Sequence, residues 1–207
     1  MSTEQNNSAA VFLKKFISIV GVDNVLNDPA DVWPYGYDNS RRHAQPELVV
    51  LPSSHDQVRD IVRLCFENKL PLVARGRGTG TTGASVPVKH GVVLSLERMI
   101  RFIKIDANNR VAVVEPGITN QAVQDKIGEA GFFWPPDPTS AAFSTIGGNL
   151  ACNSAGPRAI KYGTPRENVL GLKAITGKGE EIRPGVYTTK GVGGYDLNRL
   201  SRGSEGT

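Results

Sequence analysis

The stretch Arg75-Gly76-Arg77-Gly78-Thr79-Gly80-Thr81-Thr82-Gly83 directly follows the short apolar run Leu72-Val73-Ala74. A side chain at a glycine position would keep the backbone away from any approaching group. A run so rich in glycine is therefore typical of a loop whose backbone N–H groups surround an anion. We expect that anion to be a phosphate.

Residues 78–83 also match GxGxxG, the fingerprint of the Rossmann dinucleotide fold. In that fold the glycines open a helix, and the start of the helix holds the pyrophosphate. Here Pro87 and the apolar run 92–96 follow, which leaves room for barely one helical turn. The sequence therefore predicts strand, loop and strand, and it disfavours a Rossmann module that binds NAD.

The composition is that of a folded, soluble protein. The chain has 207 residues, of which 39% are hydrophobic and 21% charged. Its net charge of +4 is scattered, without a basic block or interleaved stacking aromatics, so we expect no nucleic-acid partner. Cys65 and Cys152 lie too far apart in sequence for a disulfide framework or a zinc motif, and we expect no metal site.

The first residues lack the charged start of a signal peptide, and no apolar run reaches the length of a membrane span. We therefore expect a cytoplasmic protein, or one that is peripheral at the inner membrane through a partner.

Periodicity and capping residues predict an α+β fold of two small subdomains. Ser8, Ser53 or Ser54, and Thr119 are expected to cap helices that end near Val20, Lys69 and Ala130. Residues 27–47 and the proline-rich run 135–138 are expected to be irregular. The expected strands are 49–51, 72–74, 92–96, 102–105 and 111–114, with a hairpin formed by 169–175 and 181–183.

A second cluster of small residues occupies 144–156, with the sequence STIGGNLACNSAG. Gly147 and Gly148 permit close backbone approach, and Ser144, Thr145 and Asn149 offer donors and acceptors. Tight packing between a helix and a loop explains one such cluster equally well. Two clusters in one chain favour a long ligand that is held at both ends.

Five motifs occur in an order that resembles the FAD-linked oxidases with a PCMH-type FAD-binding domain, named after p-cresol methylhydroxylase. Within that family the chain resembles the branch of the glycolate oxidase FAD subunit and the D-lactate and D-2-hydroxyglutarate dehydrogenases. The resemblance covers residues 35–207, and residues 1–34, with the helix that Ser8 is expected to cap, form a separate N-terminal helical segment. The resemblance implies a FAD domain that is incomplete at its C-terminal end and lacks a cap domain. The motifs are Arg75-Gly76-x-Gly78-Thr79-Gly80, Pro136-Asp137-Pro138-Thr139, Thr145-Ile146-Gly147-Gly148-Asn149, Lys161-Tyr162-Gly163 and Gly203-Ser204-Glu205-Gly206-Thr207.

The resemblance implies FAD as the cofactor, with both glycine clusters around it. It places the backbone of the first loop on the pyrophosphate, the second cluster along the pyrophosphate and isoalloxazine, and residues 169–175 near the adenine. Arg77 either adds charge or belongs to the surface, and Tyr162 either faces the flavin or is a buried packing residue. The implied cofactor residues are Arg75, Gly76, Gly78, Thr79, Gly80, Thr81, Pro138, Thr139, Ser140, Ser144, Thr145, Gly148, Asn149, Tyr162, Gly163 and, near the adenine ribose, Glu205.

Family members that bind flavin covalently often carry a histidine where this chain has Thr79. The three histidines, His43, His55 and His90, lie elsewhere. The resemblance therefore implies noncovalent FAD.

By resemblance, the chain is the FAD-binding portion of an enzyme that oxidises a small 2-hydroxy acid of the D-lactate or glycolate type by hydride transfer to flavin N5. A quinone, a cytochrome or an electron-transfer flavoprotein would accept the electrons. In the family a cap domain supplies the catalytic base and the cation for the carboxylate. We therefore expect the chain alone to be inactive and assign no role to Arg41, Arg42 and His43. The alternative is a noncatalytic FAD-binding subunit, or a fragment that needs a partner chain.

Overall fold

The computed structural model describes residues 8–188 and 193–206. They divide into two compact units. Unit 1 runs through Leu96 and includes Ile175–Glu181, and unit 2 comprises Glu97–Ala174 and the residues from Ile182 on.

Unit 1 is built on a four-stranded sheet with the order β1-β2-β4-β3. Strands β2 (Leu48–Val50), β4 (Val92–Ser95) and β3 (Leu72–Arg75) are parallel, and β1 (Val25–Leu26) is antiparallel to β2. All residues of β2 and β4 are buried, as expected for parallel strands that are covered on both faces. The predicted β-α-β unit is present, and β4 lies between its two strands.

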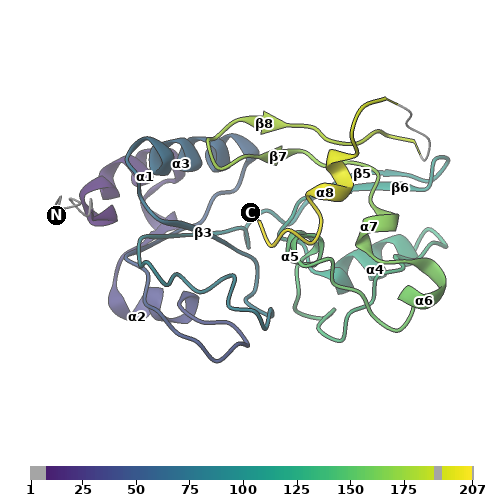
Figure 1. Ribbon diagram of the computed structural model, residues 1–207, viewed down its shortest axis with the longest axis horizontal. Helices are drawn as coiled ribbons and strands as arrows, with labels where there is room; N and C mark the ends of the chain where they lie inside the picture. The colour runs from purple at the N-terminus through teal and green to yellow at the C-terminus, as the bar shows by residue number, and fades with distance from the viewer. Residues whose placement is uncertain (1–7, 189–192, 207) are drawn as a thin grey trace. The chain divides into compact units, whose positions relative to one another are not determined.

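Helices cover both faces of this sheet (Figure 1). On one face lie α1 (Leu13–Val20), which continues the short helix η1 (Ala9–Phe12), and α3 (His55–Glu67). On the other lies α2 (Pro29–Val32), whose Val32 packs on β2 and β4. Side chains alternate along each strand: Leu48, Val50, Val92 and Leu94 face α1 and α3, and Val49 and Val93 face α2.

The predicted helix starts in unit 1 are confirmed. The side chain of Ser8 accepts a hydrogen bond from the Ala10 N–H, and the side chain of Ser54 accepts one from the Gln57 N–H. The expectation that residues 27–47 are irregular is wrong at its start. Asp28 caps α2 with Pro29 in the first turn, and the short helix η3 (Trp33–Tyr35) follows. The Asp-Pro pair is a helix-start signal, although α2 has only four residues.

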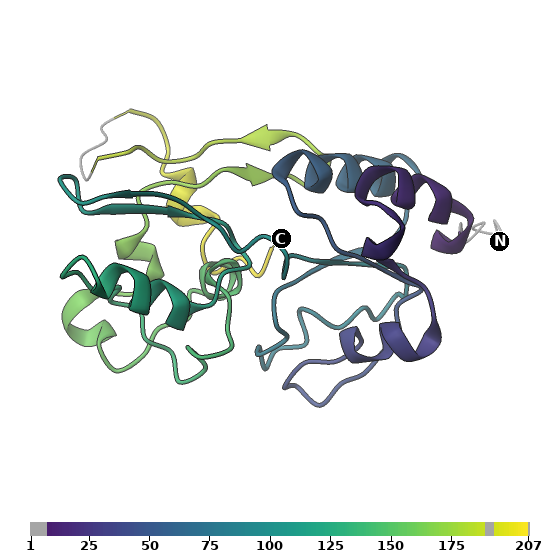
Figure 2. The ribbon, with the colours of Figure 1, turned by 180° about the vertical axis from the view of Figure 1, so that it is seen from behind.

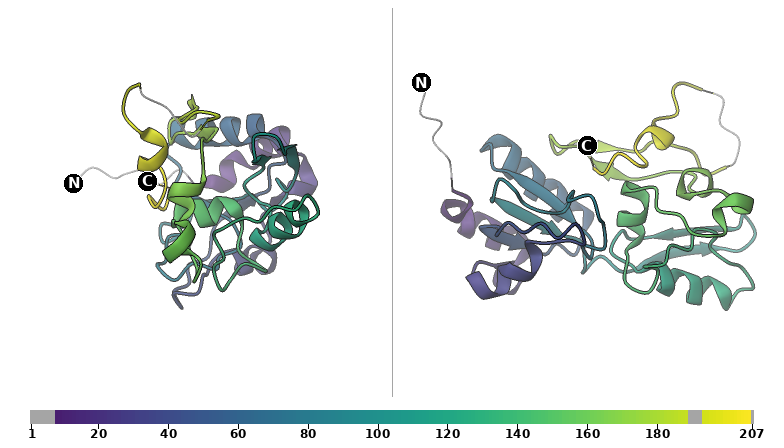
Figure 3. Two further views of the ribbon diagram at one scale, coloured as in Figure 1. Left: turned by 90° about the vertical axis from the view of Figure 1, so that its right-hand side faces the viewer. Right: turned by 60° about the horizontal axis from the view of Figure 1, so that its bottom comes forward.

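Unit 2 contains an antiparallel hairpin of β5 (Phe102–Asp106) and β6 (Val111–Val114), with α4 (Asn120–Gly128) beside it (Figures 2 and 3). Ile118, Val123, Ile127 and Ile146 form the core. Thr119 caps α4 as predicted, and the run 135–138 is irregular as predicted. Four short helices follow: α5 (Ile146–Ala151), α6 (Ala159–Tyr162), α7 (Pro165–Asn168) and α8 (Leu197–Leu200).

The predicted late hairpin exists but is short. Its strands are β7 (Ala174–Ile175) and β8 (Glu181–Ile182), and an isolated bridge joins Gly171 to Gly185. Helices and strands are mixed in both units, and the α+β fold class is confirmed.

Candidate functional site

The glycine loop leaves the C-terminal end of β3 and returns to the neighbouring parallel strand β4 without an intervening helix. The strand–loop–strand prediction is confirmed. The loop lies at the edge where the strands of parallel sheets end, and ligands of such sheets commonly bind at that edge.

The backbone of this loop presents open donors. Within residues 8–188 and 193–206, the N–H groups of Gly76, Gly78, Thr79, Gly80 and Thr81 have no hydrogen-bond partner. On the opposite side of the chain, the Gly80 carbonyl accepts from the Asn39 N–H at 2.9 Å. The C=O and N–H of a trans peptide point in opposite directions, so this bond turns the Thr81 N–H away from Asn39. The loop therefore has the donors that an anion requires.

Arg75 supports the loop from its inner side. The side chain is buried, and its guanidinium donates to the carbonyl oxygens of Tyr37 at 2.6 Å and Pro34 at 3.3 Å. A Cβ at Gly78 would lie 2.4 Å from Arg75 Nη2, and Gly78 has a φ of +65°. By contrast, a Cβ at Gly80 would meet nothing within 4 Å. A direct contact of Arg75 with the cofactor stays a prediction, and Arg77 is exposed.

The segment that precedes β2 was not identified from the sequence as a partner of the glycine loop. Asp38 is buried and accepts the Ser40 N–H at 2.9 Å, and Asn39 binds Gly80. The run Asp38-Asn39-Ser40 is the sequence signal that could have identified this segment, because it is typical of a turn stabilised by side chains.

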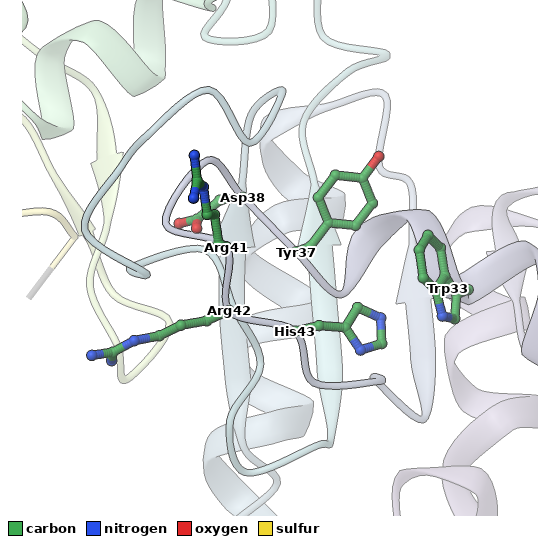
Figure 4. Close-up of a pocket in the computed structure, with 6 residues that line it drawn as sticks. All are labelled: Trp33, Tyr37, Asp38, Arg41, Arg42 and His43. Carbon is green, nitrogen blue, oxygen red and sulfur yellow. The ribbon is translucent and has the colours of Figure 1, made fainter.

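A pocket of about 290 Å³ adjoins this turn (Figure 4). The rings of Trp33 and His43 lie 4.8 Å apart, and the Arg42 side chain points away from them. The lining residues are Trp33, Tyr37, Asp38, Arg41, Arg42 and His43. No role in binding is assigned to them.

The second cluster, in unit 2, is held by its side chains. Ser144, Thr145 and Asn149 are each 2% exposed. The Thr145 hydroxyl accepts from the Gly148 N–H at 3.2 Å, and Asn149 Nδ2 donates to Ser144 Oγ at 3.1 Å. A Cβ at Gly147 would lie 2.8 Å from Pro116 Cβ. The packing explanation that the sequence left open is therefore correct for Gly147.

The proline-rich run joins the same cluster. Pro138 is buried, and the Ser140 carbonyl accepts from the Ser144 N–H at 2.8 Å, while Thr139 is exposed. A Cβ at Gly156 would lie only 1.9 Å from the carbonyl oxygen of Asp137. The structure thus brings 138–140 together with 144–149 and Gly156.

The remaining predicted residues also lie in unit 2. Tyr162 is 41% exposed and contacts Phe133 edge-to-face at 5.2 Å, so it is not a buried packing residue. Gly163 follows α6 with a φ of +80°. The Glu205 N–H donates to the Ala151 carbonyl at 2.8 Å, which places the last motif at the end of α5.

A strand–loop–strand turn with open backbone donors at the end of a parallel sheet is typical of proteins that bind a phosphate-bearing ligand. Residues 46–185 match the family model described as "FAD binding domain". The chain belongs to this family, and FAD is its cofactor.

Three curated relatives carry names from one chemical class. The glycolate oxidase subunit GlcD of Bacillus subtilis (strain 168) is 38% identical over 195 residues, which are 94% of this chain and 42% of the relative. The D-lactate dehydrogenase of Archaeoglobus fulgidus is 42% identical over 166 residues, or 80% of this chain and 37% of the relative. The D-2-hydroxyglutarate dehydrogenase of Stutzerimonas stutzeri (strain A1501) is 36% identical over 191 residues, which are 92% of this chain and 41% of the relative. The chain thus spans about two fifths of the length of these relatives.

Solved structures agree on the PCMH-type fold. p-Cresol methylhydroxylase with bound substrate aligns with a TM-score of 0.69 at 27% identity, over 85% of this chain and 35% of that one. An alkyldihydroxyacetonephosphate synthase aligns with a TM-score of 0.83 at 24% identity. The alignment covers 95% of this chain and 40% of the synthase, and the two share the fold. Among the described residues, no helix has the length and hydropathy needed to span a bilayer.

Proposed function

We propose that the chain is the FAD-binding part of a flavoprotein oxidoreductase that oxidises a small 2-hydroxy acid of the D-lactate or glycolate type. The open row of N–H groups at Gly76 and Gly78–Thr81 carries the proposal. The names of the relatives, which specify glycolate, D-lactate and D-2-hydroxyglutarate, support the substrate class. When bound, FAD supplies the hydride acceptor, flavin N5.

The chain's own residues bind and orient the cofactor. The loop N–H groups donate to the two negative charges of the pyrophosphate, and the bare Gly80 lets the backbone approach. The Arg75 guanidinium adds positive charge from the inner side of the loop. The family resemblance is the ground for also assigning cofactor contacts to Ser144, the backbone at 138–140 and 148, Tyr162, Gly163 and Glu205.

Noncovalent attachment is part of the proposal, because Thr79 offers no imidazole to the flavin. After acid precipitation of the yellow protein, we expect the flavin in the supernatant. Flavin that stays in the washed pellet would contradict noncovalent binding.

The central test is titration of the flavin-free chain with FAD, followed by flavin fluorescence, with NAD as the comparison ligand. We expect quenching with FAD and no binding of NAD. Absence of FAD binding would refute the assignment of the loop. D-Lactate or glycolate is then added without oxygen, and we expect little flavin bleaching by this chain alone. Rapid bleaching would show that no additional domain or partner is needed.

A second candidate is a noncatalytic FAD-binding subunit that serves a partner chain, since one relative is named a subunit of glycolate oxidase. Supplying a cap domain from a relative distinguishes the two. Substrate-dependent bleaching in its presence supports the oxidoreductase, and FAD binding without bleaching supports the noncatalytic subunit. On either proposal the electron acceptor is a quinone, a cytochrome or an electron-transfer flavoprotein.

A further inference from the structure

Asn120, the first residue of α4, is fully buried and joins three parts of the second cluster. Its Nδ2 donates to the Pro136 carbonyl at 3.1 Å and to Asn149 Oδ1 at 3.0 Å. Its backbone N–H donates to the Ser144 carbonyl at 2.9 Å. Through its side chain and its backbone N–H, this one residue ties the proline-rich run, residue 144 and α5 together.

The direction of each hydrogen bond in this group is fixed by chemistry. The Pro136 carbonyl can only accept, so the Asn120 amide must present its NH₂ group to it. Asn149 must then present Oδ1 to Asn120, and its Nδ2 faces Ser144 Oγ at 3.1 Å. Ser144 Oγ accepts that bond, and its own hydrogen remains to be donated. In the part of the chain that the structure describes, the Ser144 hydroxyl donates to no acceptor.

We propose that Asn120 and Asn149 are positioning residues that hold the Ser144 hydroxyl as a hydrogen-bond donor to an oxygen or nitrogen acceptor of FAD. The inference rests on the proposed function and specifies the direction of one hydrogen bond, from Ser144 to the cofactor. The phosphate oxygens and the flavin carbonyl oxygens are acceptors, so only the donating orientation of the hydroxyl matches them. Because Ser144 is 2% exposed, its acceptor must lie directly on the cluster. Asn149 then acts through Ser144, since both ends of its own amide are already bonded.

The oxygen of the Asn120 amide supports a role beyond packing. Asn120 Oδ1 is buried and has no hydrogen-bond partner among the described residues. An unsatisfied buried oxygen destabilises a fold, and an apolar side chain of similar size would avoid that cost. An apolar residue would, however, lose the two hydrogen bonds of the NH₂ group, and these bonds orient Asn149.

The test is a double-mutant cycle on FAD affinity, measured by flavin fluorescence quenching with the flavin-free chain. Asn149→Asp keeps the shape but turns the donor toward Ser144 into an acceptor, which draws the hydroxyl hydrogen inward. Ser144→Ala removes the hydroxyl. We expect each change to weaken FAD binding about tenfold, and Asn149→Asp to have no further effect in the Ser144→Ala background.

Asn153→Asp is the matched control. It adds the same charge within the same cluster, but the Asn153 oxygen that accepts from Thr164 Oγ1 and the Arg166 N–H is retained. We expect less than about a twofold change in FAD affinity. The relay is the chain of hydrogen bonds from Asn120 through Asn149 to Ser144. If Asn149→Asp weakens FAD binding equally with and without the Ser144 hydroxyl, the new charge and not this relay is responsible, and the inference fails.

A second measurement does not depend on FAD. In the flavin-free chain, the side-chain NH₂ signals of Asn120 and Asn149 should exchange slowly in NMR spectra, and Asn120→Asp should expose the signal of Asn149 to exchange. Rapid exchange of both groups in the wild-type chain would refute the relay itself. Failure of the wild-type chain to bind FAD would instead refute the proposed function.

Discussion

The glycine loop 75–83 and the cluster 144–156 have similar compositions but present their polar groups in opposite ways. In the loop the side chains at 78–83 are small, and the backbone N–H groups at Gly76 and Gly78–Thr81 are open among the described residues. In the cluster the N–H groups of Gly147, Asn149 and Cys152 are hydrogen-bonded within unit 2. Its remaining polar contacts are hydrogen bonds between side chains, such as those of Asn149 with Asn120 and Ser144. A glycine-rich sequence therefore indicates close approach, but it does not say whether the approaching group is a ligand or the protein itself.

Gly156 gives the largest expected effect and tests the claim that glycines of the cluster serve packing. Its Cβ would lie 1.9 Å from the Asp137 carbonyl oxygen, a backbone atom that cannot move aside without the proline-rich run. We expect Gly156→Ala to destabilise the protein by about 3 kcal/mol, as overpacked sites do. Chemical unfolding monitored by tryptophan fluorescence measures this. A loss below about 1 kcal/mol would show that residues 136–138 yield easily.

In the loop, Gly78 and Gly80 make a matched pair. Gly78→Ala places a side chain against the Arg75 guanidinium at a positive φ, and we expect a loss of about 1–2 kcal/mol together with weaker FAD binding. Gly80→Ala has open space and an ordinary φ, so stability should be unchanged while FAD binding weakens. Unfolding curves and FAD titration of both variants separate the two effects. Normal FAD affinity in Gly80→Ala would mean that the ligand does not approach the loop backbone there.

Glu115 extends the comparison to charge, because it is a buried carboxylate whose hydrogen bonds lie within unit 2. It is 5% exposed and accepts from the Arg101 N–H at 2.8 Å and the Arg101 guanidinium at 2.7 Å. Burial by itself would raise the pKa of Glu115, but the hydrogen bonds and charge of Arg101 outweigh it, and the net pKa is lowered. We expect Glu115→Gln to cost about 1–2 kcal/mol at neutral pH.

The pH dependence of that cost follows from the lowered pKa. A carboxylate with a lowered folded pKa contributes its full stability above the unfolded value of about 4.3, and loses it as the pH falls toward the folded value. The difference between wild type and Glu115→Gln should therefore be constant from pH 7 to about 5 and shrink below about 4.3. Urea unfolding at several pH values tests this. A difference that grows in acid would contradict the sign of the shift.

The sequence predicted the parts of the fold that local chemistry determines. Helix starts at Ser8, Ser54 and Thr119 follow from side-chain caps, and Pro87 excluded a helix after the glycine loop. It did not predict α2, because four residues are too few to show a periodicity. For the candidate site, residue types identified both glycine clusters, but not the links from Asn39 to Gly80 or from Asn120 to Asn149. Those links join residues far apart in sequence, and only the tertiary fold brings them together.

Gly128 gives the smallest expected effect, because it lies outside both the glycine loop and the cluster. It closes α4, is exposed, and a Cβ there would meet nothing within 4 Å. Neither a ligand nor a packed neighbour requires this glycine, so Gly128→Ala should raise the stability by about 0.5–1 kcal/mol through helix propensity alone. FAD affinity should be unchanged, in contrast to Gly80→Ala, whose surroundings are equally open. A thermal unfolding scan with and without FAD measures both. Loss of FAD binding in Gly128→Ala would show that Gly80→Ala is no specific test of the loop that we propose to bind the cofactor.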